Sequence, residues 1–215
     1  MRTRSPRVDR VVAPARSDPA RTAPARTAAG SRSLLAGRGG GDDARTRTIG
    51  VSIPVPAPHA GELTRFREGF GDPLARAIPP HITLLPPSEL AAADLDRVRE
   101  HLRGAAARHR AFTVHLRGTA TFRPVSSVVF VQVSRGITEC ELLEAAVRSG
   151  PLDREISFPY HPHVTVAHDV GEADLDRAEL VLRDWEATFT VGGFSLYEHG
   201  ADGVWRPRED FTFSG

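Results

Sequence analysis

Two short segments of the chain carry the same pattern of polar and apolar side chains. They are His81-Ile82-Thr83-Leu84 and His163-Val164-Thr165-Val166, and they lie 82 residues apart. Side chains alternate between the two faces of a β-strand, so the histidine and threonine of each segment point one way and the apolar pair points the other. Each strand therefore offers an imidazole and a hydroxyl on one side and is anchored to a core on the other.

Two imidazoles and two hydroxyls lining one cleft suit the hydrolysis of a phosphodiester without a metal ion. An imidazole titrates at about pH 6.5, so one ring can take a proton from water while the other, protonated, gives a proton to the leaving oxygen. Threonine hydroxyls can donate hydrogen bonds to the non-bridging phosphate oxygens. The motifs contain no carboxylate, which argues against two-metal catalysis.

The chain repeats itself around these motifs. The shift of 82 residues also aligns residues 112–118 with 194–200, and a shift of 80 aligns the identical segments 93–97 and 173–177. Two helices with equal apolar spacing are expected after the motifs, on Leu95, Val98, Leu102 and Ala105 and on Leu175, Ala178, Leu182 and Trp185. We expect an α+β fold that is bilobal and duplicated, in which two antiparallel sheets face a central cleft and the helices lie outside.

Further elements follow from hydrophobic periodicity and turn residues. Alternating apolar residues from Ile49 to Val55 predict a strand with one buried face, and Ser88 is expected to cap the helix that follows the first motif. Helices are also predicted on Leu63, Phe66 and Phe70 and on Cys140, Leu143 and Val147. The other predicted strands cover about residues 79–87, 111–118, 127–134, 160–168, 189–199 and 204–213.

Charge divides the 215 residues into two parts. The chain has no lysine, and residues 1–47 hold 11 Arg and 4 Asp and no aromatic residue, whereas residues 48–215 have a net charge of −6. A segment so poor in apolar side chains cannot offset the entropy of ordering, so residues 1–47 are expected to be a disordered extension. It is interpreted as an over-extended translation start, an organelle transit peptide or a basic tail with RNA affinity, and these alternatives stay open.

Cysteine content and hydropathy restrict the class of protein. Cys140 is the single cysteine, which excludes an intramolecular disulfide framework and a multi-cysteine zinc site. A zinc site on His161, His163 and His168 is disfavoured, because no cysteine or acidic partner accompanies them. No run approaches 18 apolar residues, so we expect no segment that spans a membrane. We also expect a cytoplasmic monomer that uses no metal and no cofactor.

The two motifs, their separation and the duplicated pattern resemble the 2H phosphoesterase superfamily, and within it the branch of 2′-5′ RNA ligases or RNA 2′,3′-cyclic phosphodiesterases. The resemblance covers about residues 48–213. It implies a bilobal, metal-independent enzyme that opens a ribose 2′,3′-cyclic phosphate to a 2′-phosphate. It also implies that His81 is the proton donor, that His163 is the proton acceptor, and that Thr83 and Thr165 bind phosphate.

One position departs from that branch, and four residues are secondary candidates. The branch often has an arginine five residues after the second motif histidine, where this chain has His168. His168 and Arg123 are candidates for phosphate contacts, and Phe122 and Tyr160, like Trp205, for base stacking. Core packing is the simpler interpretation of the three aromatic residues.

The expected partner is an RNA 3′ end or a nucleotide that carries a 2′,3′-cyclic phosphate. The acidic folded part disfavours a long groove for duplex RNA. Three alternatives stay open: reversible 2′-5′ ligation, action on another small cyclic nucleotide, and a noncatalytic domain of the same fold that binds a nucleotide or RNA end.

Overall fold

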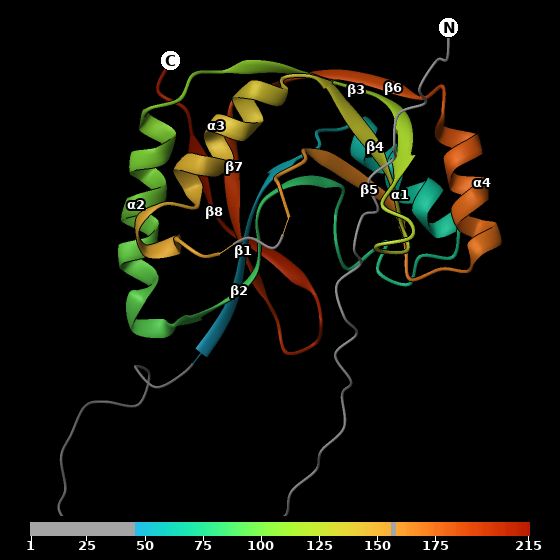
Figure 1. Cartoon of the computed structure of the whole chain (residues 1–215). Helices are drawn as coiled ribbons and strands as arrows, with labels where there is room; N and C mark the ends of the chain where they lie inside the picture. Colours follow the sequence, from blue (N-terminus) through green and yellow to red (C-terminus); the bar gives the residue numbers. More distant parts are fainter. Residues whose placement is uncertain (1–45, 156–157) are drawn as a thin grey trace, which may run out of the picture. The chain divides into compact units, whose positions relative to one another are not determined.

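Residues 46–155 and 158–215 are described by a computed structural model, shown in Figure 1. The extension predicted at residues 1–47 lies outside this part of the chain, except for Thr46 and Arg47, which begin the first strand. The strands are β1 (Thr46–Pro54), β2 (His81–Ala91), β3 (Phe112–Thr121), β4 (Val128–Arg135), β5 (His163–His168), β6 (Glu186–Val191), β7 (Gly193–His199) and β8 (Trp205–Thr212). The helices are α1 (His59–Gly69), α2 (Leu95–Ala107), α3 (Ile137–Val147) and α4 (Glu172–Leu182), with short 3₁₀ turns at Ala92–Asp94 and Gly150–Leu152.

The strands form one antiparallel sheet in the order β6-β3-β4-β5-β2-β1-β7-β8. The α+β class is confirmed. The two expected sheets are present as four-stranded halves, which meet at β5 and β2 through the backbone pair Ile82 and Val164. The motif strands thus lie side by side in the middle of a continuous sheet.

Each half of the sheet contains strands from both repeated segments. The β3–β4 hairpin follows β2 in the chain but pairs with β5 and β6, while the β7–β8 hairpin pairs with β1. The helices follow the same exchange, because α2 packs on β8 and α3 on β2, whereas α1 packs on β5 and α4 on β3, β4 and β5. Figure 1 shows α2 and α3 beside one half of the sheet and α1 and α4 beside the other.

The helix faces predicted from apolar spacing form the core. Val98, Leu102 and Ala105 of α2 and Leu175, Ala178 and Leu182 of α4 are all fully buried. None of the helices in the described ranges combines the length and the hydropathy that crossing a membrane requires.

Two local expectations are wrong. Ser88 does not cap a helix; it lies within β2, which runs on to Ala91, and its hydroxyl donates to the Pro86 carbonyl. The first strand buries both faces rather than one, because the Trp205 ring lies against Gly50 on the second face, and every residue from Ile49 to Ile53 is buried.

The strand predicted at 189–199 is instead two strands in different halves of the sheet. β6 pairs with β3 at one edge, and β7 pairs with β1 and β8 in the other half. The chain crosses between them at Gly192 and Gly193. A Cβ on Gly193 would lie 2.3 Å from the carbonyl oxygen of Phe211, whereas a Cβ on Gly192 would meet nothing within 4 Å. Only the second glycine is required by close approach of the backbone.

Alanine substitution at these two glycines should therefore have unequal effects. Gly193→Ala should lower the free energy of unfolding by about 1–3 kcal/mol, because β8 must move away from the added methyl group. Gly192→Ala is the matched control and should change it by less than about 0.5 kcal/mol. Urea unfolding of both variants measures the difference, and equal stabilities would contradict this account of the crossing.

Candidate active site

The four motif residues share one face of the sheet at the point where its halves meet. Ile82 and Val164 are paired and fully buried, while the residues on either side of each are partly exposed. Continuing the antiparallel register from that pair places Thr165 opposite His81 and Thr83 opposite His163. The two imidazoles therefore stand diagonally across the seam, which is the line where β2 and β5 pair. In such a pair, directly opposed Cβ atoms lie about 5 Å apart and diagonal ones about 7–8 Å.

The backbone fixes the same tautomer in both histidines. Nδ1 of His81 lies 2.7 Å from the Pro79 carbonyl oxygen, and Nδ1 of His163 lies 2.7 Å from the His161 carbonyl oxygen. A carbonyl oxygen can only accept, so each Nδ1 carries the proton. A proline stands between each histidine and its acceptor residue and has no N–H of its own. In the neutral ring, Nε2 is left with a free lone pair.

Burial lowers the pKa of both imidazoles below the ordinary value. For His81, desolvation is the main cause, the hydrogen bond to Pro79 opposes it, and the nearby charge of Arg67 adds to it. For His163, desolvation again dominates over the backbone hydrogen bond, and the charges of His161 and His81 lower the pKa further. Both rings are therefore biased toward the neutral form.

Aromatic rings supply much of the burial around His163. Its ring meets Phe122 edge-on with centroids 5.0 Å apart, and Phe130 lies 4.9 Å away. The two phenylalanine rings contact each other at 4.3 Å. These apolar surfaces exclude water from one side of the imidazole, which accounts for its depressed pKa.

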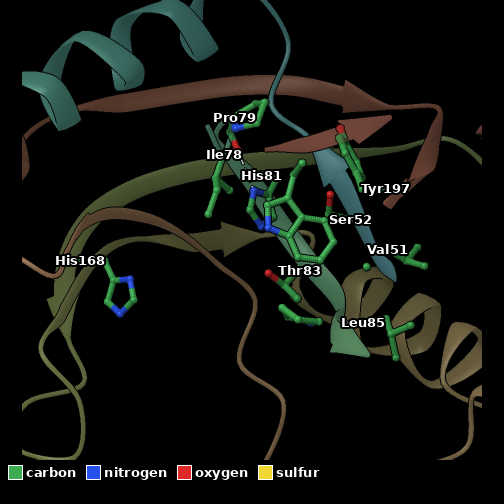
Figure 2. Close-up of a pocket in the computed structure, with 12 residues that line it drawn as sticks. Val51, Ser52, Ile78, Pro79, His81, Thr83, Leu85, His168 and Tyr197 are labelled. Carbon is green, nitrogen blue, oxygen red and sulfur yellow. Dashed lines mark hydrogen bonds between the residues drawn. The ribbon is translucent and has the colours of Figure 1, made fainter. Parts of the chain in front are cut away.

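A cavity of about 300 Å³ opens beside His81 and Thr83. Figure 2 shows both side chains on β2, with Ser52 and Tyr197 toward one wall and His168 on its own toward the other. Its lining is mainly apolar and includes Ile78, Leu85 and Trp205. The indole of Trp205 rests against Gly50, whose absent Cβ would lie 3.1 Å from the ring.

A smaller cavity of about 130 Å³ adjoins the first and shares His81 and His168 with it. Arg67 from α1 and Thr165 from β5 complete its polar lining. His163 lines neither cavity and stands beside them along the seam. Three of the four motif residues thus line these two cavities.

Comparison with known proteins agrees with this arrangement. The family model of the 2′-5′ RNA ligase superfamily matches residues 55–203, which include both motifs. The chain belongs to this superfamily. A relative from Bacillus cytotoxicus, named "Putative phosphoesterase", is 28% identical over 144 residues, which are 65% of this chain and 82% of the relative. A relative of the same name from Bacillus thuringiensis is 27% identical over the same shares.

Solved structures of other proteins have a similar fold. The crystal structure of E. coli LigT complexed with 3′-AMP covers 80% of this chain and 100% of LigT, with a TM-score of 0.56 and 21% identity. The structure of a Thermus thermophilus protein covers 78% of this chain and 98% of its own, with a TM-score of 0.52 and 23% identity. At these identities the likeness concerns the fold alone.

The secondary candidates of this superfamily member fall in different places. His168 lines both cavities, with Nε2 3.5 Å from the Asp169 carboxylate. Phe122 contacts the His163 ring, and the Tyr160 hydroxyl donates to the Thr83 carbonyl oxygen at 3.0 Å. Both aromatic residues therefore support the motif strands. Burial raises the pKa of the Tyr160 hydroxyl.

Arg123 is not brought to either cavity. Its guanidinium binds three carboxylates on α4, at 2.8 Å to Glu172, 2.7 Å to Asp176 and 3.0 Å to Glu179. These contacts raise the pKa of the guanidinium, which remains charged. Its donors are thus engaged by carboxylates rather than offered to a phosphate.

Sequence reasoning missed Arg67, Ser52 and Tyr197, all of which line the cavities. Ser52 gave a signal, because it is a polar residue inside an otherwise apolar strand. Arg67 gave none, since an arginine on an amphipathic helix is ordinarily solvated. Its place in the cavity lining depends on where α1 packs.

The depressed imidazole pKa values predict that stability falls on acidification. An unfolded histidine binds a proton at about pH 6.5, whereas His81 and His163 bind theirs only at lower pH in the folded state. The unfolded state therefore holds more protons below about pH 6.5, and the free energy of unfolding decreases as pH falls.

Urea unfolding between about pH 7.5 and 5.5 measures this slope. The double variant His81→Gln/His163→Gln should lose less stability over that interval than the wild type. An unchanged slope in the double variant would show that neither imidazole is held neutral by its surroundings.

Proposed function

We propose that the protein hydrolyses a 2′,3′-cyclic phosphate, on a nucleotide or at an RNA end, to a 2′-phosphate without a metal ion. The observation that carries the proposal is the register at the seam. It sets two Nδ1-protonated imidazoles and two threonine hydroxyls on one face, beside a cavity.

The two imidazoles can supply both proton transfers that this hydrolysis needs. Nε2 of the neutral His163 takes a proton from water as the water oxygen bonds to phosphorus. The bond from phosphorus to the ribose 3′ oxygen breaks, and Nε2 of the protonated His81 gives that oxygen its proton. The product is a 2′-phosphomonoester and a 3′ hydroxyl, and proton exchange with solvent then restores the two rings.

The charge of the substrate explains how His81 can be protonated although its surroundings lower its pKa. A proton donor must be protonated, yet burial and Arg67 lower the pKa of His81. A cyclic phosphodiester is a monoanion, and an anion beside an imidazole raises its pKa. Substrate binding thus favours the acid form of His81. The choice of His81 as acid and His163 as base rests on the resemblance to the superfamily, because the two motifs are nearly equivalent by sequence.

The larger cavity suits the nucleoside portion of such a substrate. Apolar walls with an aromatic ring bind the faces of a nucleobase, and Trp205 provides that ring. Among the described residues that line the two cavities, Arg67 is the only arginine, so the lining favours one phosphate group over a long polyanion.

Removal of either motif imidazole should abolish most turnover. With a 2′,3′-cyclic nucleotide in EDTA, His81→Ala and His163→Ala should each lower kcat by about 10²- to 10⁴-fold, because each removes one proton transfer. His115→Gln is the control and should retain full activity, because His115 lies on β3 beside Glu186 of β6 and lines neither cavity. Wild-type turnover that is lost in EDTA and restored by a metal would contradict the mechanism, and tight nucleotide binding with no turnover would favour the noncatalytic alternative.

Loss of the indole should weaken substrate binding more than it slows chemistry. Trp205→Ala should raise KM by about 5- to 100-fold with a smaller change in kcat, since stacking on an aromatic side chain contributes about 1–3 kcal/mol per base. Trp185→Ala is the matched control, because Trp185 lies beside Glu62 and lines neither cavity. Equal KM values for wild type and Trp205→Ala would show that the base does not stack there.

A further inference from the structure

The smaller cavity contains a buried cation whose role the two motifs do not explain. Arg67 lies on α1, which packs against β5, and its side chain is only 5% exposed. It lines the cavity together with His81, Thr165 and His168. An arginine so deeply buried is costly unless its donors are satisfied, so its position beside the motif residues calls for a reason.

The contacts of Arg67 use only part of its donor capacity. Nε donates to the Asp72 carboxylate at 2.8 Å, and Nη1 donates to the Ile78 carbonyl oxygen. A guanidinium carries five N–H groups, and within the described part of the chain these are the two hydrogen bonds that it makes. Three N–H groups thus remain for a ligand in the cavity that the side chain lines.

The pair with Asp72 holds the guanidinium in place. Asp72 is 1% exposed on its side chain, and its second oxygen accepts from the backbone N–H of Leu74 at 2.9 Å. The carboxylate is thereby fixed from both sides, and the bond to Ile78 ties the same guanidinium to the segment that leads into His81. The fork of donors is therefore oriented before any ligand arrives, which is the condition for strong anion binding.

We infer that Arg67 binds the non-bridging oxygens of the substrate phosphate in the small cavity that Thr165 and His168 also line. The identity of the anion rests on the proposed function. The smaller cavity has a volume of about 130 Å³, which is sufficient for a phosphate group.

Binding of inorganic phosphate to the whole protein tests this inference without requiring turnover. Calorimetric titration should give a dissociation constant about 10- to 100-fold higher for the double variant Arg67→Gln/Asp72→Asn than for the wild type. The double change removes the buried pair together, so no lone charge is left behind. Arg65→Gln, an exposed position on the same helix, is the control and should bind phosphate as the wild type does.

The outcomes separate this inference from the proposed function. Unchanged phosphate affinity in a double variant that melts like the wild type overturns the role of Arg67, as does a wild type that binds no phosphate. If the double variant does not fold, a crystal structure of the wild type with phosphate decides. Phosphate oxygens within hydrogen-bond distance of the Arg67 Nη atoms support the inference, and phosphate bound away from Arg67 overturns it. A wild type that binds phosphate through Arg67 but leaves cyclic phosphates intact contradicts the proposed function alone.

Discussion

A single backbone pair, Ile82 with Val164, joins the two halves of the sheet, and the candidate site depends on it. Both side chains are fully buried, and burial of an aliphatic side chain contributes about 1.5–3 kcal/mol. Because side chains alternate along a strand, that burial forces the neighbouring histidines and threonines to the opposite face. A slip of one residue in either strand would bury the imidazoles and expose the apolar pair. The register that stabilises the core is thus the register that assembles the polar groups.

The exchange of hairpins between the halves accompanies the position of β5 and β2 at the centre of the sheet. β2 and β5 belong to different repeats, and each is supported on its outer side by strands from both. Helices α1 and α3 cover the motif strands, since α1 packs on β5 and α3 on β2. The same packing carries Arg67 to the cavity. Duplication therefore supplies two equivalent strands, β2 and β5. Their surroundings differ, because α1, which lies between β1 and β2 in the chain, brings Arg67 to the cavity.

The two motif histidines have different surroundings, and this difference can give two similar motifs different roles in proton transfer. His81 lies near the charge of Arg67 and beside the apolar cavity, whereas His163 lies against Phe122 and Phe130 and near His161. An anionic ligand in the cavity opposes the charge of Arg67 and favours protonation of His81. The aromatic rings around His163 favour its neutral form. These are the states that a proton donor and a proton acceptor need at the start of a reaction.

Sequence reasoning predicted the local parts of this structure and missed those that depend on long-range packing. The α+β class, the helix faces on Leu102 and Leu175 and the alternation at the motifs follow from periodicity, which is a local property. The break at Gly193 and the position of Arg67 in the cavity lining depend on where β8 and α1 lie, which no local pattern encodes. Ser88 followed a capping pattern, but the strand pairing of β2 with β1 overrode it. The surroundings of Arg123 were also missed, because the three carboxylates that bind it lie about 50 residues away in the chain.

The pH dependence of kcat/KM for a 2′,3′-cyclic nucleotide tests the central claim most directly, because it reports the acid and the base of the free enzyme. The account predicts a bell-shaped profile whose acidic limb disappears in His163→Gln and whose alkaline limb disappears in His81→Gln, each at a reduced rate. A wild-type profile that is flat between about pH 5 and 8 would contradict the pairing of the two imidazoles at the seam.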